Sequence, residues 1–239
     1  MFLPVTESGR VPVDAAGAAV LVTNAPSSLQ VRVGEFTAVL MEEAAASALG
    51  TLRDATFFAG QPLILKAIHL VRNRRETRFD PRTGRELDYA PPGIVGRDPA
   101  DERRMVFPRL DPAVIGLVEL AGQERILLGA NRRRRGYYSL IAGYVDPGET
   151  LEEAFAREVL EETGRRVRNI SYWGSQPWPP SGSLMVGFRA LTEDVEPVCD
   201  TDGELAESRW LSREELPGFP IARKGTIAHT MIMEWYHGA

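Results

Sequence analysis

Short apolar runs separated by turn residues fill the first third of the chain. Gly, Asn, Pro and Ser interrupt these runs, which is typical of short strands. Three of the runs predict strands, at residues 18–23, 29–33 and 36–40. Two other segments predict helices, one rich in Ala and Glu and one that changes from apolar to basic, at residues 41–49 and 63–74. We therefore expect residues 1–75 to form a small N-terminal α/β domain.

After Phe107 the apolar runs become longer and less interrupted. Residues 113–118 are apolar almost without interruption, as in a strand that is buried on both faces. Further strands are expected at residues 125–129, 137–142, 167–173, 184–191 and 208–211. A helix that begins at Thr150 and a closing helix at residues 222–235 complete the order, which favours an α/β/α sandwich over residues 107–239. Residues 76–106, which are charged and rich in turn residues, predict a connector between the two domains.

The helix after Thr150 has clear limits in the sequence. Thr150 and Glu153 have the spacing of a capping box, and Gly164 suits the position at which a helix ends. Directly before the helix, the triplet Asp-Pro-Gly at residues 146–148 is typical of a turn. The helix has an apolar side formed by Leu151, Ala154, Phe155 and Val159.

Three carboxylates crowd another face of this helix. Glu158 and Glu162 stand at i and i+4, and Glu161 is three residues from Glu158. Like charges at this spacing repel, and a divalent cation would relieve the repulsion, because carboxylate oxygens are the ligands that Mg²⁺ and Mn²⁺ prefer. Taken alone, the helix favours a solvated face rich in Glu over a metal site.

Composition and charge exclude several other classes of protein. The hydrophobic fraction of 44% is ordinary for a globular protein, and the net charge of −5 provides no general attraction to nucleic acid or membrane. No apolar run is long enough for a transmembrane helix, and the N-terminus lacks the pattern of a signal peptide. Cys199 is the single cysteine, so an internal disulfide is excluded. We expect a soluble, cytoplasmic protein that does not contact a membrane.

The pattern from Gly143 to Arg165 resembles the signature box of the Nudix hydrolases. Gly143 is followed after five residues by Glu149, and after seven more by Arg-Glu-apolar-x-Glu-Glu-x-Gly at residues 157–164. The last position of the box departs from the family, because Arg165 stands where an aliphatic residue is usual. The resemblance implies a Nudix α/β/α sandwich and a hydrolase that depends on Mg²⁺ or Mn²⁺.

A second motif, at residues 175–183, resembles the loop that marks the NADH pyrophosphatase subfamily of Nudix hydrolases. The family reads Ser-Gln-Pro-Trp-Pro-Phe-Pro-x-Ser, and the chain matches it without a gap. Pro180 replaces the Phe, Ser181 replaces the Pro, and Gly182 takes the variable position. An aromatic residue in a nucleotide site usually stacks on a ring, so the missing Phe bears on substrate choice. The alternative interpretation of this motif is purely structural: a rigid Pro-rich loop in which Trp178 is packed for stability.

The resemblance assigns roles to individual residues. It implies metal ligation by the Ala142 carbonyl oxygen and by Glu158, Glu161, Glu162 and Glu204, the last standing six residues before Trp210. The catalytic set that it implies is Glu149, Arg157, Glu161 and Glu162, with Glu161 as additional ligand or general base, Arg157 orienting Glu161 or Glu149, and Glu149 bracing the loop. The substrate contacts that it implies are Phe107, Gln176, Pro177, Trp178, Pro179, Pro180, Ser181, Gly182, Ser183 and Ala228.

The implied reaction is hydrolysis of the pyrophosphate of NADH or NAD⁺ to NMN(H) and AMP, and in some members removal of the NAD cap from RNA. One alternative is a Nudix hydrolase of another nucleoside diphosphate, such as ADP-ribose or a diadenosine polyphosphate. Another is a nucleotide-sensing or RNA-binding protein without turnover. The basic loop at residues 131–136 is either a solvated turn or a collar of positive charge near a phosphate-bearing ligand.

The connector departs from this subfamily, which usually carries a zinc ribbon with two Cys-x-x-Cys pairs. The first pair would open after Arg78 and Phe79, where the chain has Asp80, Pro81, Arg82 and Thr83. Zinc sites need thiolates or imidazoles, and three scattered histidines cannot supply one. We therefore expect a degenerate ribbon without structural zinc. The resemblance also implies a homodimer with the N-terminal half at the interface.

Overall fold

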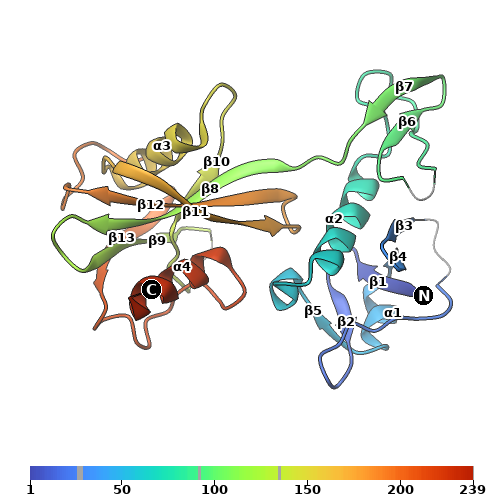
Figure 1. Cartoon of the computed structure of the whole chain (residues 1–239), viewed down its shortest axis with the longest axis horizontal. Helices are drawn as coiled ribbons and strands as arrows, with labels where there is room; N and C mark the ends of the chain where they lie inside the picture. The colour runs from blue at the N-terminus through green and yellow to red at the C-terminus, as the bar shows by residue number, and fades with distance from the viewer. Residues whose placement is uncertain (26–28, 91–92, 134–135, 239) are drawn as a thin grey trace. The chain divides into compact units, whose positions relative to one another are not determined.

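The computed structural model describes residues 1–25, 29–90, 93–133 and 136–238. The chain divides into two compact units (Figure 1). The first contains residues 1–110 together with residues 177–183, and the second contains residues 111–176 and 184–239. The finer boundaries expected from the sequence, at residues 75 and 106, stay a prediction.

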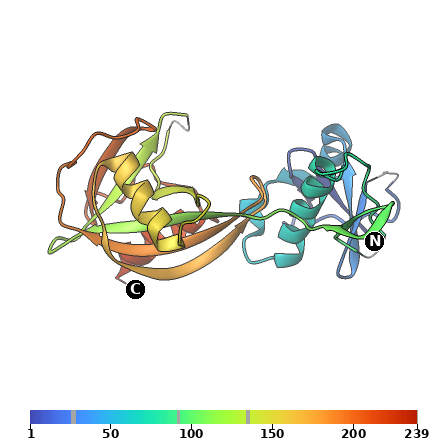
Figure 2. The same ribbon diagram turned by 90° about the horizontal axis from the view of Figure 1, so that it is seen from above.

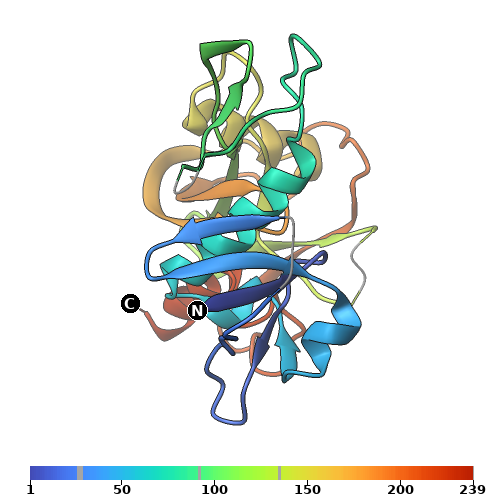
Figure 3. The ribbon, with the colours of Figure 1, turned by 90° about the vertical axis from the view of Figure 1, so that its right-hand side faces the viewer.

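The N-terminal part of the first unit is a small sheet covered by one long helix (Figure 3). Strand β4 (Phe36–Met41) lies between β1 (Phe2–Thr6), which is parallel to it, and β3 (Gln30–Val33), which is antiparallel. Helix α2 (Pro62–Glu76) buries its apolar side in the core of this unit. The remaining elements are short: β2 (Val11–Val13), α1 (Glu43–Ser47), β5 (Thr51–Arg53) and the 3₁₀ helix η1 (Ala55–Phe58). Strands β2 and β5 pair with each other.

Residues 18–23 do not form the strand expected from their composition. Ala19 makes an isolated bridge with Val13, and Val22 makes another with Phe2. The segment thus passes from β2 to β1 and pairs at one residue with each, so no continuous ladder can form. The predicted helices at 41–49 and 63–74 correspond to α1 and α2, the first of them shorter than expected.

The connector contains a hairpin of β6 (Gly96–Asp98) and β7 (Asp101–Val106) and a polar network around two buried carboxylates. Asp80, where the first ribbon cysteine would stand, accepts the N–H groups of Arg82 and Thr83 at 2.7 and 3.1 Å. The Arg104 guanidinium donates to both carboxylate oxygens of Asp80. The Thr83 hydroxyl donates to Asp98 at 2.8 Å. Hydrogen bonds therefore join the two turns of the connector.

The second unit is built on one six-stranded sheet in the order β11-β12-β8-β9-β13, and β10 also pairs with β8. The strands are β8 (Asp111–Leu120), β9 (Arg125–Asn131), β10 (Ile141–Tyr144), β11 (Arg168–Trp178), β12 (Ser183–Thr192) and β13 (Leu205–Ser212). Helix α3 (Leu151–Thr163) covers one face and α4 (Ile227–His237) covers the other (Figures 1 and 2).

Alternation along the central strands produces two cores. On β8, Val114 and Val118 point into the cluster around Phe155 of α3, whereas Ile115 and Leu117 point into the cluster around Met231 of α4. Successive residues of a strand face opposite sides of the sheet, so a strand that is apolar throughout needs a helix on each face. The α/β/α sandwich predicted from the sequence is confirmed.

Two element limits in this unit differ from the expectation. The third strand was predicted over residues 137–142, but β10 covers Ile141–Tyr144 and Ser139 makes only an isolated bridge to Gly129. The basic loop before it ends in this bridged segment, and residues 134–135 of that loop lie outside the described residues. Helix α4 begins at Ile227 and not at residue 222, because the Thr226 hydroxyl caps it by accepting the N–H of His229. No helix within the described ranges is long and apolar enough to cross a membrane.

Candidate active site

Helix α3 presents the carboxylates, and its limits match those expected from the sequence. Thr150 and Glu153 form a reciprocal capping box, in which the Thr150 hydroxyl accepts the Glu153 N–H and the Glu153 carboxylate accepts the Thr150 N–H. Gly164 ends the helix with φ of 67°, a conformation that favours glycine. Fixed ends keep the register of the helix, and the register decides which glutamates face β10.

Gly143 lets α3 approach β10 closely. A Cβ atom at this position would lie 1.9–2.2 Å from the carboxylate of Glu158, so any side chain would displace it. Ala142 precedes Gly143 on the same strand and pairs with Ile115 of β8. The Glu158 carboxylate therefore lies against the backbone of β10, beside the residue whose carbonyl oxygen is the predicted neutral ligand.

Arg157 connects three carboxylates and the loop before the helix. It donates to both oxygens of Glu149, at 2.6 and 3.0 Å, and to Glu158 and Glu161, at 2.9 Å each. It also donates to the Tyr144 carbonyl oxygen at 2.9 Å. These contacts, led by that to Glu149, raise the pKa of Arg157. The sequence left open whether Arg157 orients Glu149 or Glu161, and the structure shows contacts to both.

Glu162 is buried next to other acids. Its side chain is 6% exposed, and no donor among the described residues contacts its carboxylate. Burial raises the pKa of Glu162 to about 8, and the charges of Glu158 and Glu204 contribute in the same direction. A carboxylate in this setting is held protonated or is compensated by a cation.

Glu158 shares part of this environment. Burial raises its pKa, Arg157 partly opposes the shift, and the charges of Glu161 and Glu204 add to it. Glu204 lies in the loop before β13, where its oxygen Oε1 accepts a hydrogen bond from the Asn131 side chain at 2.9 Å. The loop is tied to the end of α3, because the Asp202 N–H donates to the Glu161 carbonyl oxygen at 2.9 Å.

These donors suit a hard divalent cation. Glu158, Glu162 and Glu204 act electrostatically on one another, and two of them are desolvated without enough cationic partners. No three His, Cys, Asp or Glu side chains within the described ranges already converge as a coordination group. Glu158 is instead turned toward Arg157. Oxygen ligands with excess negative charge nevertheless fit Mg²⁺ or Mn²⁺, which keep several water or phosphate ligands of their own.

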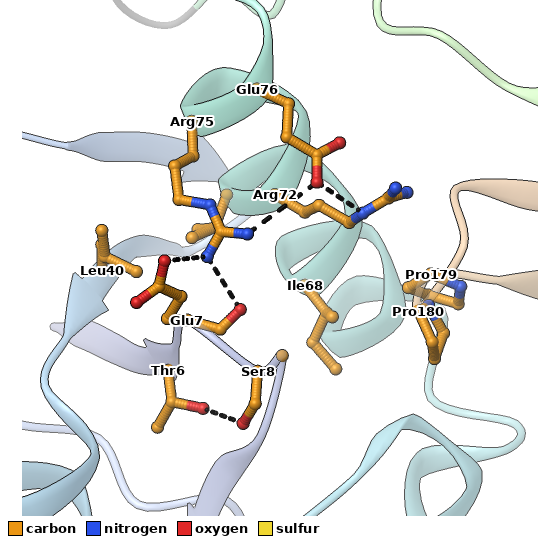
Figure 4. A pocket seen from close by; sticks show the side chains of 12 residues that line it. Thr6, Glu7, Ser8, Leu40, Ile68, Arg72, Arg75, Glu76, Pro179 and Pro180 are labelled. Atoms are coloured by element: carbon orange, nitrogen blue, oxygen red, sulfur yellow. Dashed lines mark hydrogen bonds and ion pairs between the residues drawn. The ribbon is translucent and has the colours of Figure 1, made fainter.

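The motif at residues 175–183, which carries most of the predicted substrate contacts, is divided between the two units. Pro177 to Ser183 belong to the first unit, where Pro179 and Pro180 line a pocket of about 250 Å³ with residues of the turn after β1 and of α2 (Figure 4). Gly182 has φ of 74°, and a side chain there would meet the Arg72 guanidinium. Trp178 is half-buried, and Ser181 and Ser183 are joined by a hydrogen bond between their hydroxyls. Phe107, also in this unit, is 63% exposed.

Gln176 belongs to the second unit and has both ends of its amide engaged. Its Nε2 donates to the Gly225 carbonyl oxygen at 2.8 Å, and its Oε1 accepts the Ile227 N–H at 2.7 Å. Ala228 follows in the first turn of α4 and is buried. Gln176 thus fixes the start of α4, where Ala228, another predicted substrate contact, lies. Both polar atoms of the Gln176 amide are hydrogen-bonded to backbone groups.

Comparison with known proteins identifies the family of the second unit. The NUDIX domain model matches residues 109–235, which is more than half of the chain. The chain belongs to the Nudix family. A Nudix hydrolase from Nitrosomonas europaea has a similar fold, with a TM-score of 0.53 and 23% identity over 67% of this chain and 91% of that one.

Two curated relatives carry the name NAD-capped RNA hydrolase NudC. The protein from Vibrio cholerae is 40% identical over 180 residues, which is 75% of this chain and 63% of the relative. The protein from Mycobacterium bovis is 38% identical over 168 residues, which is 70% of this chain and 52% of the relative. The chain therefore spans less than two thirds of the length of these Nudix relatives.

Arg165, the departure at the end of the Nudix box, has a structural explanation. Its side chain is buried, and its guanidinium donates to the carbonyl oxygens of Thr163 and Val195. Its Cζ atom lies 5.5 Å from the centroid of the Trp210 ring, a cation–π distance. Burial lowers the pKa of Arg165, and nearby acids oppose this shift. The Arg165 side chain is thus buried, as an aliphatic side chain at this position would be, and backbone carbonyl oxygens accept the hydrogen bonds of its guanidinium.

Sequence reasoning missed two residues beside the Nudix carboxylates. Asp202 adds negative charge next to Glu162 and accepts the N–H of Glu204 at 2.8 Å. Asn131 holds the Glu204 side chain. Asn131 ends β9, and β9 pairs with β13, the strand that follows Glu204. Once this strand pairing is known, a polar residue at the end of β9 indicates a partner for Glu204.

Proposed function

We propose that this protein hydrolyses the pyrophosphate bond of NADH or NAD⁺ to NMN(H) and AMP, and removes the NAD cap from RNA. One observation carries the proposal: the desolvated pair Glu158 and Glu162 lies on the box helix of a Nudix domain, with Arg157 bracing the same face. The names of the relatives support the choice of substrate.

Mg²⁺ or Mn²⁺, when bound, would neutralise the pyrophosphate and activate the attacking water. Glu158, Glu162 and Glu204 would hold the ions, with the Ala142 carbonyl oxygen as a neutral ligand. Arg157 holds Glu149 against the loop and fixes oxygen Oε2 of Glu161. Glu161 is half-exposed, so it is free to act as additional ligand or as general base. Gln176 fixes the turn before Ala228, where the backbone would contact the substrate.

A panel of substrates tests the proposal. NADH, NAD⁺, ADP-ribose, a diadenosine polyphosphate and NAD-capped RNA are incubated with the protein and Mg²⁺ or Mn²⁺, and the products are identified by mass. We expect NMN(H) and AMP from the dinucleotides, and 5′-monophosphate RNA from the capped RNA. Binding without any turnover would instead support a nucleotide-sensing or RNA-binding protein.

A broader nucleoside-diphosphate hydrolase is the second candidate, and Pro180 favours it. This exposed residue stands where the subfamily has an aromatic ring, so the wall for a base is thinner. We expect weak discrimination among the dinucleotides of the panel, and Pro180→Phe should sharpen it. Strict selectivity of the wild type for NADH would exclude the broader activity.

We also propose a homodimer without structural zinc. Chain mass in solution, measured by light scattering after gel filtration, tests the first part. The second part rests on the polar network of Asp80, Thr83, Asp98 and Arg104, which occupies the connector in place of thiolates.

A further inference from the structure

Asn131 makes two contacts through the two ends of its side-chain amide. It is the last residue of β9 and pairs with Leu205, the first residue of β13. Its Nδ2 donates to oxygen Oε1 of Glu204 at 2.9 Å, and its Oδ1 accepts the N–H of Arg133 at 2.9 Å. One side chain therefore joins a predicted metal ligand to the basic turn that follows β9.

The backbone of Glu204 is held as firmly as its side chain. Its N–H donates to Asp202 at 2.8 Å, and its carbonyl oxygen accepts the N–H of Arg132 at 3.2 Å. Asp202 in turn donates its N–H to the carbonyl oxygen of Glu161 on α3. Glu204 is close enough to Glu158 and Glu162 for its charge to act on both. The side-chain torsions of Glu204 are thus the remaining freedom, and Asn131 restricts them.

We propose that Asn131 is a positioning residue that presets Glu204 for the catalytic cation. It fixes one carboxylate oxygen and leaves the other, to which no described residue donates, for the metal. The inference rests on the proposed function and on Glu204 as a ligand. Groups that hydrogen-bond a ligand and orient it are typically worth about 10-fold to 100-fold in metal affinity.

The chemistry of the donor matters. Arg157 neutralises the carboxylates that it contacts, whereas the Asn131 amide is uncharged and leaves the full negative charge of Glu204 for a cation. Holding a flexible Glu side chain in place before binding also reduces the conformational entropy lost when the metal binds. A neutral donor at this position therefore orients the ligand without competing with the metal.

The test measures Mn²⁺ binding to the whole protein, without substrate, from the electron paramagnetic resonance signal of free Mn²⁺. Asn131→Ala removes both contacts of the amide. Asn131→Ser keeps a hydroxyl that can accept the Arg133 N–H in a similar turn but is too short to reach Glu204. We expect both variants to raise the Kd for Mn²⁺ about 10-fold or more. Arg132→Ala, which loses a contact to the Leu205 carbonyl oxygen and keeps the Asn131–Glu204 bond, is the matched control and should bind as the wild type does.

Combining Asn131→Ala with Glu204→Gln separates this inference from the proposed function. We expect Asn131→Ala to have no further effect once Glu204 is changed, because the two residues act as one unit. Equal unfolding temperatures in EDTA would show that the fold is intact. Wild-type affinity in Asn131→Ser, or independent effects of the two changes, would overturn the positioning role while Glu204 remains a ligand. Unchanged affinity in Glu204→Gln alone would overturn the ligand assignment, and the inference with it.

Discussion

The connector and helix α3 both bury carboxylates, but the surroundings of these carboxylates differ. Asp80 and Asp98 are 1% and 0% exposed, and each accepts hydrogen bonds from several donors. Burial raises the pKa of Asp80, but the Arg82 N–H and the Arg104 guanidinium outweigh it and lower the pKa below its ordinary value. The Ala100 N–H lowers the pKa of Asp98 against its burial, and Thr83 and Arg85 contribute. On α3 the pKa of Glu158 and of Glu162 is raised.

This difference separates a structural carboxylate from one prepared for a ligand. The connector supplies its own donors, so its charge is compensated within the fold. Helix α3 gathers negative charge and, at Glu162, supplies no donor within the described residues. The missing compensation must come from a proton or a cation. Four predictions test this contrast.

The first prediction concerns Glu162. Glu162→Gln keeps the shape of the side chain and removes the charge, so we expect kcat to fall by roughly 10² or more, because several kcal/mol of transition-state stabilisation depend on the metal. The thermal midpoint in EDTA should stay equal or rise, because repulsion by Glu158 and Glu204 is relieved. Steady-state kinetics at saturating Mg²⁺ and Mn²⁺ and thermal unfolding measure the two effects.

Glu152→Gln is the control for this substitution. Glu152 lies in the first turn of α3 and is exposed, outside the matched positions of the Nudix box. It should keep near wild-type turnover. Near wild-type kcat in Glu162→Gln, or simple unfolding of that variant, would show that Glu162 does not serve the metal.

The second prediction concerns metal removal. EDTA should abolish hydrolysis without unfolding the protein, and added Mg²⁺ or Mn²⁺ should restore it, because we propose that α3 holds the cation and that the connector holds none. Elemental analysis of the purified protein should find no stoichiometric zinc. One tightly bound zinc per chain, or unfolding of the connector in EDTA, would contradict the contrast between the two regions.

The third prediction concerns Arg104, which donates to both oxygens of Asp80. Arg104→Met leaves a buried carboxylate with fewer donors, so we expect the thermal midpoint to fall by about 5 °C or more. Turnover per folded molecule should change little. Asp80→Asn in the same variant should recover part of the loss, since the uncompensated charge is then absent.

Arg103→Met is the matched control for Arg104. Arg103 lies on the same strand, its side chain is 95% exposed, and its carboxylate partner Asp101 is 3.5 Å away. Exposed ion pairs contribute little to stability, so this change should leave the midpoint almost unchanged. Equal losses in the two variants would show that the Asp80 network is no more important than a surface pair.

The sequence determined much of this arrangement but not all of it. The capping box and Gly164 predicted the limits of α3, and the i, i+4 spacing predicted the shared face of Glu158 and Glu162. The close approach of Gly143 to Glu158 depends on strand pairing, which spacing along the chain does not encode. The roles of Asn131 and Gln176 are hidden for the same reason, because their partners lie 73 and about 50 residues away.

Arg165 shows that a departure from a sequence motif can be explained by contacts that only the fold reveals. From the sequence alone, this charged residue is only a departure at a position of the Nudix box that is usually aliphatic. The structure provides carbonyl oxygens and the Trp210 ring around it, so the substitution is accommodated. Local pattern predicts which residue types a position usually takes, whereas only the folded chain shows which partners are within reach.

The last prediction concerns the pH dependence of stability in EDTA. The pKa of Glu162 is raised from 4.5 to about 8 in the folded protein. A raised pKa means that the folded state binds the proton more tightly than the unfolded state. The resulting stabilisation is complete below pH 4.5 and is lost as pH rises through 8.

The unfolding free energy of the wild type, measured by urea titration in EDTA, should therefore fall between these pH values more steeply than that of Glu162→Gln. Saturating Mg²⁺ should oppose the fall, because the cation compensates the charge that the proton has left. If the unfolding free energies of wild type and variant changed with pH in parallel, Glu162 would be solvated. The contrast between the carboxylates of α3 and those of the connector would then be wrong.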